Sequence, residues 1–314
     1  MKKNRTVDRV IITGPTASGK SALALDLCRQ VPDTFEIVSA DSVQVYRGLD
    51  IGSGKVSRAV REQVPHHLID ILDPDESFDV SSFCAYAERA ERDIYSRDRV
   101  PLVVGGTFLY IHAYVHGISP MPEADPALRA ELETFVKESG SAALHERLKQ
   151  VDPASAARIH PNDKQRLIRA MEVYRSSGQT MSELRGRGSG RMTAKTCMFA
   201  LVQTRDELYG RINARFDGMI REGLVDEVRQ LHRIGYDSGT PALKTIGYAQ
   251  MSEFMDGLIT LDDACENAKK MTRRYAKKQM TWINGCDTCK KVDYRDSHDI
   301  IINIKRTLEA GREY

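Results

Sequence analysis

RVIITGPTASGKSALAL, residues 9–25, joins a short apolar run to a glycine-rich loop and then to a helical pattern. Within it, Gly14, Gly19, Lys20 and Ser21 have the spacing G-x-x-x-x-G-K-S, which is typical of a phosphate-binding loop (P-loop) between a strand and a helix. This order of elements predicts an α/β fold with a parallel sheet.

The loop has the chemistry of an anion site. Glycines let the backbone turn tightly and point its N–H groups toward an anion, and the helix that starts near Lys20 adds a partial positive charge. Lys20 supplies a full charge, and the hydroxyl of Ser21 is a suitable ligand for Mg²⁺. The loop does not identify which di- or triphosphate binds. We expect that phosphate group to contact Gly14, Thr16, Ala17, Ser18, Gly19, Lys20 and Ser21.

Composition indicates a soluble globular protein. The chain has 314 residues, of which 41% are hydrophobic and 29% charged, and its net charge is +2. No apolar stretch approaches the roughly 18 residues needed to cross a bilayer, and the apolar run near the N-terminus is too short for a signal peptide. We therefore expect a cytoplasmic monomer without a membrane partner. The six scattered cysteines suit reduced thiols better than a disulfide framework.

Polar residues follow two further apolar runs. Residues 35–40 read as a strand that ends at Asp41, and residues 100–104 read as a strand that ends in Gly105-Gly106-Thr107. Ligands of open parallel sheets bind beyond the carboxyl ends of the strands, so both ends should face the phosphate-binding loop. Asp41 could act there as a general base or could cap the next helix, and its position alone favours neither role.

A third run, His66–Leu72, predicts a strand that carries Asp70, a carboxylate placed like the one that binds Mg²⁺ in many ATPases. The strand ending at Val104 has no such acidic residue, which weakens a reading as an ATP-hydrolysing enzyme. We expect His66 and His67 to be hydrogen-bonded structural residues, because no third residue has the spacing of a metal ligand.

Strand patterns are absent from residue 119 to about residue 200. Residues 125–139, 141–150 and 160–178 instead have helical patterns, with Asn162 or Asp163 as a cap. We therefore expect a helical insertion at 119–200 in an α/β core made of 1–118 and 201–314. GRGSGR, at 186–191, has the composition of a flexible loop.

Six cations gather late in the chain, on a helical pattern that spans residues 269–278. Such a helix could follow a phosphate backbone or could simply present a solvated face. Tyr275 and Trp282, seven residues apart, could stack on nucleic acid or face the core. Cys286-Asp-Thr-Cys289 is a lone C-x-x-C pair, and we do not expect it to bind a metal.

Several motifs together resemble the tRNA dimethylallyltransferase family, also called tRNA isopentenyltransferases. They extend from about residue 8 to residue 284 and occur in the order GPTASGKS (14–21), SADSVQVYRGLDIGSGK (39–55), PHHLID (65–70), GGTFLY (105–110), RIHPNDKQRLIRA (158–170) and RRYAKKQMTW (273–282). The resemblance implies a P-loop NTPase-like parallel sheet with an inserted helical domain. It also implies transfer of a dimethylallyl group from dimethylallyl diphosphate to the exocyclic N6 amine of the adenosine next to the anticodon of a tRNA.

The resemblance also assigns roles to residues. Asp41 matches the family's catalytic base, Thr107 the residue that steadies the reacting amine, and Gln44 a contact to the target base. Arg205, Arg211 and Arg215 lie in a region that holds a diphosphate-binding arginine, and we favour Arg211. Ser21 would help to hold Mg²⁺. Expected tRNA contacts are Asp41, Ser42, Val43, Gln44, Arg129, Gln165, Arg166, Leu167, Ile168, Arg169 and Lys244.

Three other functions remain possible from the residues. A P-loop kinase of small molecules would use ATP at the same loop. An adenylate isopentenyltransferase would perform the same chemistry on a free nucleotide. A noncatalytic RNA-binding protein would leave the intact loop and Asp41 unexplained.

Overall fold

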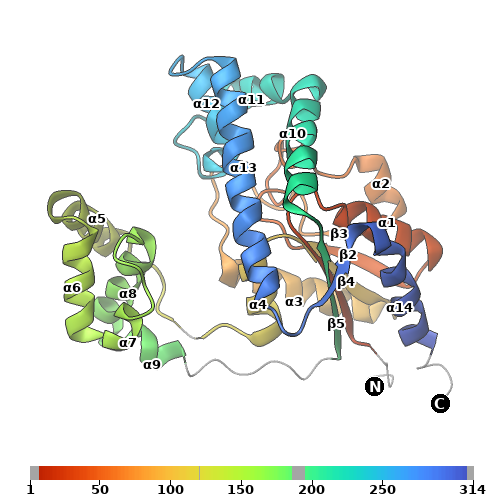
Figure 1. Cartoon of the computed structure of the whole chain (residues 1–314), viewed down its shortest axis with the longest axis horizontal. Helices are drawn as coiled ribbons and strands as arrows, with labels where there is room; N and C mark the ends of the chain where they lie inside the picture. Colours follow the sequence, from red (N-terminus) through yellow and green to blue (C-terminus); the bar gives the residue numbers. More distant parts are fainter. Residues whose placement is uncertain (1–6, 120, 186–194, 310–314) are drawn as a thin grey trace. The chain divides into compact units, whose positions relative to one another are not determined.

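The structure, a computed structural model, describes residues 7–119, 121–185 and 195–309 (Figure 1). The predicted loop at 186–191 lies outside these residues. The strands are β1 (Arg9–Thr13), β2 (Phe35–Ser39), β3 (His66–His67), β4 (Val100–Gly105), β5 (Thr196–Val202) and β6 (Lys290–Asp293). The helices are α1 (Lys20–Gln30), α2 (Arg58–Gln63), α3 (Val80–Ser96), α4 (Phe108–His116), α5 (Pro126–Ser139), α6 (Ser141–Val151), α7 (Pro153–Ala156), α8 (Lys164–Ser177), α9 (Met181–Arg185), α10 (Arg205–Glu222), α11 (Leu224–Arg233), α12 (Tyr248–Met255), α13 (Leu261–Asn284) and α14 (Ser297–Glu309), with 3-10 helices η1 (Pro241–Lys244) and η2 (Tyr294–Asp296).

The strands form one parallel sheet in the order β3-β2-β4-β1-β5-β6. The central strand β1 pairs with β4 on one side and with β5 on the other. Because all strands run in one direction, the carboxyl ends of β1, β2 and β4 lie at the same edge of the sheet. The prediction of an α/β fold with a parallel sheet is confirmed.

The strand predicted over 66–72 is wrong beyond its first two residues. Leu68 and Asp70 have φ angles of 63° and 56°, which an extended strand does not allow. The two histidines are hydrogen-bonded, as predicted: His66 Nδ1 lies 2.6 Å from Val64 O, and His67 Nε2 lies 2.7 Å from a carboxylate oxygen of Glu36.

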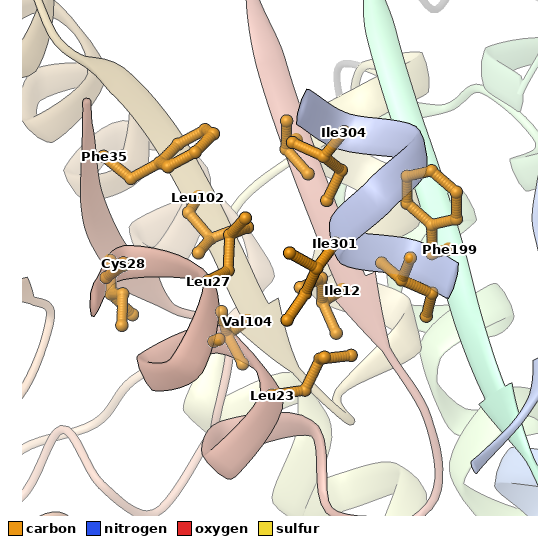
Figure 2. Packing of buried hydrophobic residues seen from close by; sticks show 14 of the residues in the cluster. Ile12, Leu23, Leu27, Cys28, Phe35, Leu102, Val104, Phe199, Ile301 and Ile304 are labelled. Carbon is orange, nitrogen blue, oxygen red and sulfur yellow. The ribbon is translucent and has the colours of Figure 1, made fainter. Parts of the chain in front are cut away.

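Apolar side chains of two helices cover one face of the sheet (Figure 2). Leu27 of α1 and Ile301 of α14 are almost fully buried, and they share one cluster with Ile12 of β1 and Leu102 of β4. This packing fixes α1, and therefore the loop that precedes it, against the carboxyl edge of the sheet.

A second apolar cluster joins α10, α11, α12 and α13 to the segment that follows β2. Val45 and Leu49 of that segment are fully buried in it, beside Leu224 and Tyr248. The helices that wall the carboxyl edge are therefore anchored to the chain that leaves β2.

The chain divides into two compact units, Met1–Tyr114 with Thr193–Tyr314, and Val115–Met192. The smaller unit has its own apolar core, formed by helices α5 to α9. Asp163 caps α8 by accepting a hydrogen bond from Arg166 N, as its sequence pattern predicts. The expected boundary at residue 200 is too late, because β5 begins at Thr196 and pairs with β1 in the sheet of the larger unit.

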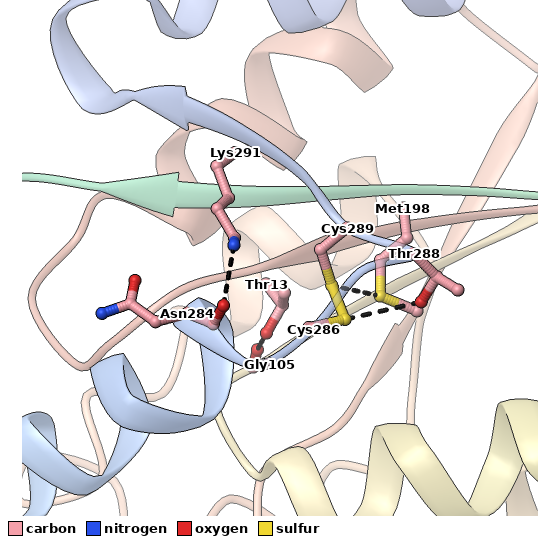
Figure 3. Close-up of a disulfide and its surroundings, with 8 residues drawn as sticks. All are labelled: Thr13, Gly105, Met198, Asn284, Cys286, Thr288, Cys289 and Lys291. Carbon is pink, nitrogen blue, oxygen red and sulfur yellow. Dashed lines mark hydrogen bonds between the residues drawn. A yellow bond between two sulfur atoms is a disulfide. The ribbon is translucent and has the colours of Figure 1, made fainter.

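Cys286 and Cys289 are joined by a disulfide in the turn between α13 and β6 (Figure 3). The expectation of reduced thiols is wrong for this pair. The expectation rests on the number and scatter of the cysteines, which do not reveal local geometry. This turn brings the two Cα atoms to 5.6 Å, which is within disulfide range. Cys28, Cys84, Cys197 and Cys265 carry no disulfide. Among the helices of the described ranges, none is long and apolar enough to cross a membrane.

Candidate active site

A cavity of about 800 Å³ opens at the carboxyl edge of the sheet, within the larger unit. The phosphate-binding loop forms one wall, and the residues that follow β2 and β4 form another. Helices α10 and α13 and the segment 244–247 close it. The motifs that the sequence placed at strand ends therefore meet around one space.

The phosphate-binding loop has the backbone that an anion cradle needs. Gly19 has a φ of 93° immediately before α1 begins at Lys20, a conformation that favours glycine. Thr16, Ala17, Lys20 and Ser21 line the cavity with Gly19. Of the remaining expected phosphate contacts, Ser18 is buried at 1% exposure, and a Cβ added to Gly14 would collide with the Ser18 hydroxyl. Gly14 and Ser18 do not line this cavity.

The positive charge of Lys20 is only partly neutralised by its neighbours. Its Nζ donates to Pro15 O at 3.1 Å. The pKa of Lys20 is lowered to about 8: burial is the main cause, the positive charge of Arg215 adds to it, and the carboxylate of Asp41 opposes both effects. Two cations thus share a desolvated space with one carboxylate, which favours binding of a multiply charged anion.

Asp41 combines the two roles that the sequence left open. Its Oδ1 accepts hydrogen bonds from Val43 N at 2.9 Å and Gln44 N at 3.3 Å, so it fixes the turn after β2. No helix begins there, and Oδ2 has no hydrogen bond to any described residue. Because Asp41 lines the cavity, this second oxygen is available to take a proton.

Thr107 lies where β4 turns into α4 and lines the cavity together with Tyr275 of α13. Burial raises the pKa of Tyr275 and Asp41 adds to that effect, whereas the side chains of Thr107 and Gln279 act to lower it. The net shift is upward, so the phenol stays protonated. The sequence leaves open whether Tyr275 packs in the core or contacts nucleic acid, and in the structure it lines the cavity.

Gln279 joins two loops of the site. The residue is 4% exposed. Its Oε1 accepts from Thr16 N at 2.9 Å, and its Nε2 donates to Gly106 O at 2.8 Å. The amide therefore fixes the phosphate-binding loop against the loop that carries Thr107. Sequence reasoning missed this residue, although the spacing of Tyr275 and Gln279 (i, i+4) places them on one helix face.

Two arginines of α10 reach the phosphate-binding loop. Arg211 Nε donates to Ala17 O at 2.8 Å, and its guanidinium lies over the Tyr294 ring at 4.8 Å. Arg215 Nη1 donates to Thr16 Oγ1 at 2.9 Å, and burial lowers the pKa of this residue. Arg205, by contrast, lies over the Tyr209 ring at 5.1 Å and does not line the cavity. The sequence favoured Arg211, but Arg215 is the cation that acts on Lys20.

A single carboxylate of α11 holds the loop over residues 50–54. Glu227 accepts backbone hydrogen bonds from Asp50 N (3.0 Å), Ile51 N (2.7 Å) and Gly52 N (3.2 Å). It also accepts from the Tyr248 hydroxyl at 2.6 Å. The tight packing of that tyrosine ring leaves no room for a Cβ at Gly52.

The far side of the same loop faces the cavity. Ser53 O accepts from Gln44 Nε2 at 3.4 Å and from Arg215 Nη2 at 3.3 Å. Ser39 Oγ donates to the Gln44 side-chain carbonyl at 3.1 Å. Glu227 therefore positions, through the loop, two side chains that line the cavity, Gln44 and Arg215.

Asp70 lies away from the phosphate-binding loop. Its two carboxylate oxygens pair with Lys55 Nζ and Arg61 Nη1, each at 2.6 Å. The Lys55 side chain is only 1% exposed and also pairs with Asp50. Asp70 therefore neutralises buried and half-buried cations, and the comparison with an ATPase carboxylate is wrong.

The predicted tRNA contacts fall into two groups. Ser42, Val43, Gln44 and Lys244 line the cavity with Asp41. The other group lies in the smaller unit, on α5 and α8, and includes Arg129, Gln165 and Arg166.

The α8 group is only partly available to a ligand. Leu167 and Ile168 are 0% and 6% exposed, so their side chains belong to the helical core. Arg169 is tied to Glu172 and to Pro122 O. Gln165 and Arg166 are exposed, and Arg166 makes a long ion pair with Asp163 at 3.5 Å. A sequence motif does not show which of its side chains face solvent. In this stretch only Gln165 and Arg166 are exposed.

The donor set suits a Mg²⁺ ion held mainly by phosphate. Within the described residues, no group of three His, Cys, Asp or Glu side chains could hold a metal. The hydroxyl of Ser21, in the first turn of α1, and the carboxylate of Asp41 both line the cavity and are oxygen ligands of suitable type. Mg²⁺ is commonly bound by one or two protein oxygens together with substrate phosphates and water, which fits this set.

Two family models match the chain, one described as IPP transferase over residues 44–285 and one described as isopentenyl transferase over residues 7–66. The tRNA dimethylallyltransferase of Geobacter sulfurreducens is 44% identical over 94% of this chain and 94% of its own length. The tRNA dimethylallyltransferase 2 of Geotalea daltonii is 44% identical over 100% of this chain and 96% of its own length.

Solved structures give the same similarity. The crystal structure of full-length tRNA isopentenylpyrophosphate transferase from Bacillus halodurans matches with a TM-score of 0.70 and 38% identity, covering 98% of each chain. A eukaryotic dimethylallyltransferase acting on tRNA matches with a TM-score of 0.74 and 25% identity, covering 91% of this chain and 73% of its own.

Proposed function

The chain belongs to the IPP transferase family, and from that membership we propose that it transfers a dimethylallyl group from dimethylallyl diphosphate to the N6 amine of the adenosine next to the anticodon of tRNA. It is an enzyme of the prenyltransferase class. The observation that carries the finer proposal is one cavity in which Lys20 and Arg215 lie beside a carboxylate with a free oxygen.

The phosphate end of the cavity binds the leaving group. The allylic C–O bond breaks with its electron pair on the diphosphate oxygen, so negative charge grows there. Lys20, Arg215 and the N–H groups of the loop compensate that charge in a desolvated space. Arg211 adds a third cation at the rim. The helix that starts at Lys20 contributes its positive end.

The opposite end of the cavity binds the N6 amine of the adenosine. The N6 lone pair is delocalised into the purine, so the amine must lose a proton as the new C–N bond forms. Asp41 Oδ2 accepts that proton while Oδ1 keeps the turn in place. Thr107, which lines the cavity with Tyr275, orients the amine by a hydrogen bond. Gln44 contacts the target base.

Ser21 and the diphosphate would hold a Mg²⁺ ion, which supplies additional neutralisation of the leaving group when it is bound. The remaining contacts to tRNA come from Ser42, Val43 and Lys244 in the larger unit. In the helical unit they come from Arg129, Gln165 and Arg166. The side chains of Leu167 and Ile168 are buried and that of Arg169 is held by Glu172, so these three act only by shaping the helix that carries Gln165 and Arg166. We further infer a monomeric enzyme that acts where tRNA is found, in the cytoplasm.

Two rivals use the same loop. A kinase of small molecules would often have a Mg²⁺-binding carboxylate at the end of the strand next to β1. Here β4 ends without one, and Asp70 is engaged by Lys55 and Arg61. An adenylate isopentenyltransferase has the same chemistry, and the helical unit with its exposed Arg166 favours the larger RNA substrate.

The test is transfer of label from dimethylallyl diphosphate to unmodified tRNA, with ATP and AMP assayed in parallel. We expect label on the adenosine next to the anticodon and none on AMP. Label on AMP would support the adenylate enzyme. Phosphate transferred from ATP, with no prenylated RNA, would overturn the proposal.

A further inference from the structure

An apolar stripe is exposed on α13, and of its three residues only Tyr275 belongs to the cavity described above. Met271, Tyr275 and Trp282 are 39%, 36% and 40% exposed, although large apolar side chains are usually buried. Their spacing (i, i+4, i+11) places them on one face of the helix, with Lys278 between the last two. Leu109 of α4, 60% exposed, follows two residues after Thr107.

Trp282 has one covered face and one open face. Its ring stacks on Phe108 with centroids 5.5 Å apart and an interplanar angle of 22°, and the ring of His112 meets it edge-on at 5.2 Å. A stacked neighbour covers only one side of the indole, so the exposed area belongs mainly to the opposite side. Phe108 of α4 thus supports the indole on one side, and α4 lies near the C-terminal end of α13 in Figure 1.

Cations flank the stripe. Lys269 and Arg273 are used within the fold, by Asp217 and Asn213. No ion pair of Lys270, Lys277 or Lys278 occurs within the described ranges. A stripe of aromatic rings between uncompensated cations suits single-stranded nucleic acid, whose bases stack while its phosphates attract the lysines. A protein partner with an apolar face would leave these charges without compensation.

The stripe leads from the cavity to Trp282. Tyr275 lines the cavity, and Trp282 is seven residues further along the helix, or about 10 Å at about 1.5 Å per residue. That distance equals about three stacked nucleotides at about 3.4 Å each. A base stacked on Trp282 would therefore lie within about three nucleotides of a nucleotide in the cavity.

We propose that the open face of Trp282 stacks on an unpaired base of the tRNA anticodon loop, within three nucleotides of the adenosine that is modified. The inference rests on the proposed function, because it takes that adenosine as the occupant of the cavity. The indole holds a neighbouring base of the loop, which keeps the flipped adenosine in place at the cavity. Flipping costs a few kcal/mol, and such a stack offsets part of that cost.

The experiment uses the single tryptophan of the chain as its own probe. The full-length enzyme is titrated with an unmodified anticodon stem-loop RNA, and indole emission is followed alongside the anisotropy of labelled RNA. We expect emission to be quenched with the same dissociation constant as the anisotropy change. Abasic nucleotides are then placed one at a time around the reactive adenosine, and one of them should abolish the quench.

Variants test the energetics. Trp282→Leu keeps an apolar contact to Phe108 but has no ring, and it should weaken RNA binding about 5- to 150-fold, the range measured for loss of one stacked base. Trp282→Phe should bind within a few-fold of wild type. In Trp282→Leu the critical abasic substitution should have no additional effect, because both changes remove one contact. A merely structural role would instead give additive losses.

Tyr86→Leu is the matched control. Tyr86 has the same exposure, 40%, and packs edge-on against Phe78 at 6.0 Å, but it lies on α3 and does not line the cavity. Its substitution should leave RNA binding unchanged. If the wild type binds and prenylates tRNA while emission is unaffected and Trp282→Leu binds normally, the stacking inference is wrong and the proposed function stands. If the wild type neither binds nor prenylates tRNA, the proposed function itself fails.

Discussion

Replacing Gln279 by leucine should slow transfer, because this side chain joins the two loops between which the reaction takes place. Its amide accepts from Thr16 N at 2.9 Å and donates to Gly106 O at 2.8 Å, and the residue is 4% exposed. Leucine has a similar size but can make neither hydrogen bond. The change leaves one backbone donor and one backbone acceptor without their partners.

The size of the effect follows from where those two groups lie. A backbone group left without a partner costs about 1–3 kcal/mol when it is sealed from water. Thr16 and Gly106 both line the cavity, so water can reach them, and we expect a loss of unfolding free energy of about 2 kcal/mol for the pair. Turnover should fall more steeply, about 10- to 100-fold, because a displacement of about 1 Å between reacting groups can cost two orders of magnitude.

The assay is single-turnover transfer with both substrates saturating, together with thermal unfolding of the same preparations. Gln203→Leu is the matched control. Gln203 is also buried, at 8% exposure, but both polar atoms of its side chain lack a hydrogen-bond partner in the described part of the chain. That substitution should leave stability equal or improved and turnover unchanged. Normal turnover in Gln279→Leu, or an equal loss in Gln203→Leu, would refute the role of Gln279 as the link between the loops.

Three further outcomes are expected. Asp41→Asn keeps the acceptor that fixes the turn but cannot take a proton. Turnover should therefore fall about 10²-fold or more, while the tRNA dissociation constant changes little. A normal rate would show that Asp41 is not the base. Burial lowers the pKa of Lys20 to about 8, so kcat/KM for dimethylallyl diphosphate should fall as pH rises above about 8, and a profile flat to pH 10 would contradict this. Burial would raise the pKa of Glu36, but hydrogen bonds from Arg97 and His67 lower it from 4.5 to about 2. The ionised Glu36 therefore stabilises the folded protein above pH 4.5, and this contribution is lost as the pH falls toward 2. Urea unfolding midpoints measured from pH 7 to pH 2 should fall less steeply in Glu36→Gln than in the wild type.

The phosphate-binding loop and its partners at the strand ends could be predicted because short contiguous motifs fix their own geometry. The spacing of Gly19, Lys20 and Ser21 requires a strand before and a helix after, and a parallel sheet then brings Asp41 and Thr107 to the same edge. The structure agrees, since all of them line one cavity. Predictions of this kind need only local sequence and one rule of topology.

Predictions failed where a local pattern has more than one three-dimensional outcome. The run at 66–72 has the composition of a strand, but Asp70 takes a positive φ and pairs with Lys55 and Arg61, which its own neighbours in sequence do not reveal. On α8, the matching motif includes Leu167 and Ile168, which the helix turns into its own core. Hydrophobic periodicity and composition predict whether a segment is a helix or a strand. They do not predict the partners of a side chain, because those come from segments far away in the chain.

Glu227 illustrates what sequence patterns leave out at the active site. Its carboxylate holds the backbone of Ile51 from 176 residues away, and nothing in α11 marks it, because charged side chains are ordinary on an exposed helix. Yet the loop that it fixes presents Ser53 O to both Gln44 and Arg215, the side chains assigned to the target base and the leaving group. A change at residue 227 or in the loop would move both groups at once. This wall of the cavity therefore depends on both α11 and the segment after β2. The role of residues 50–54 follows only when the helix that holds them is considered with them.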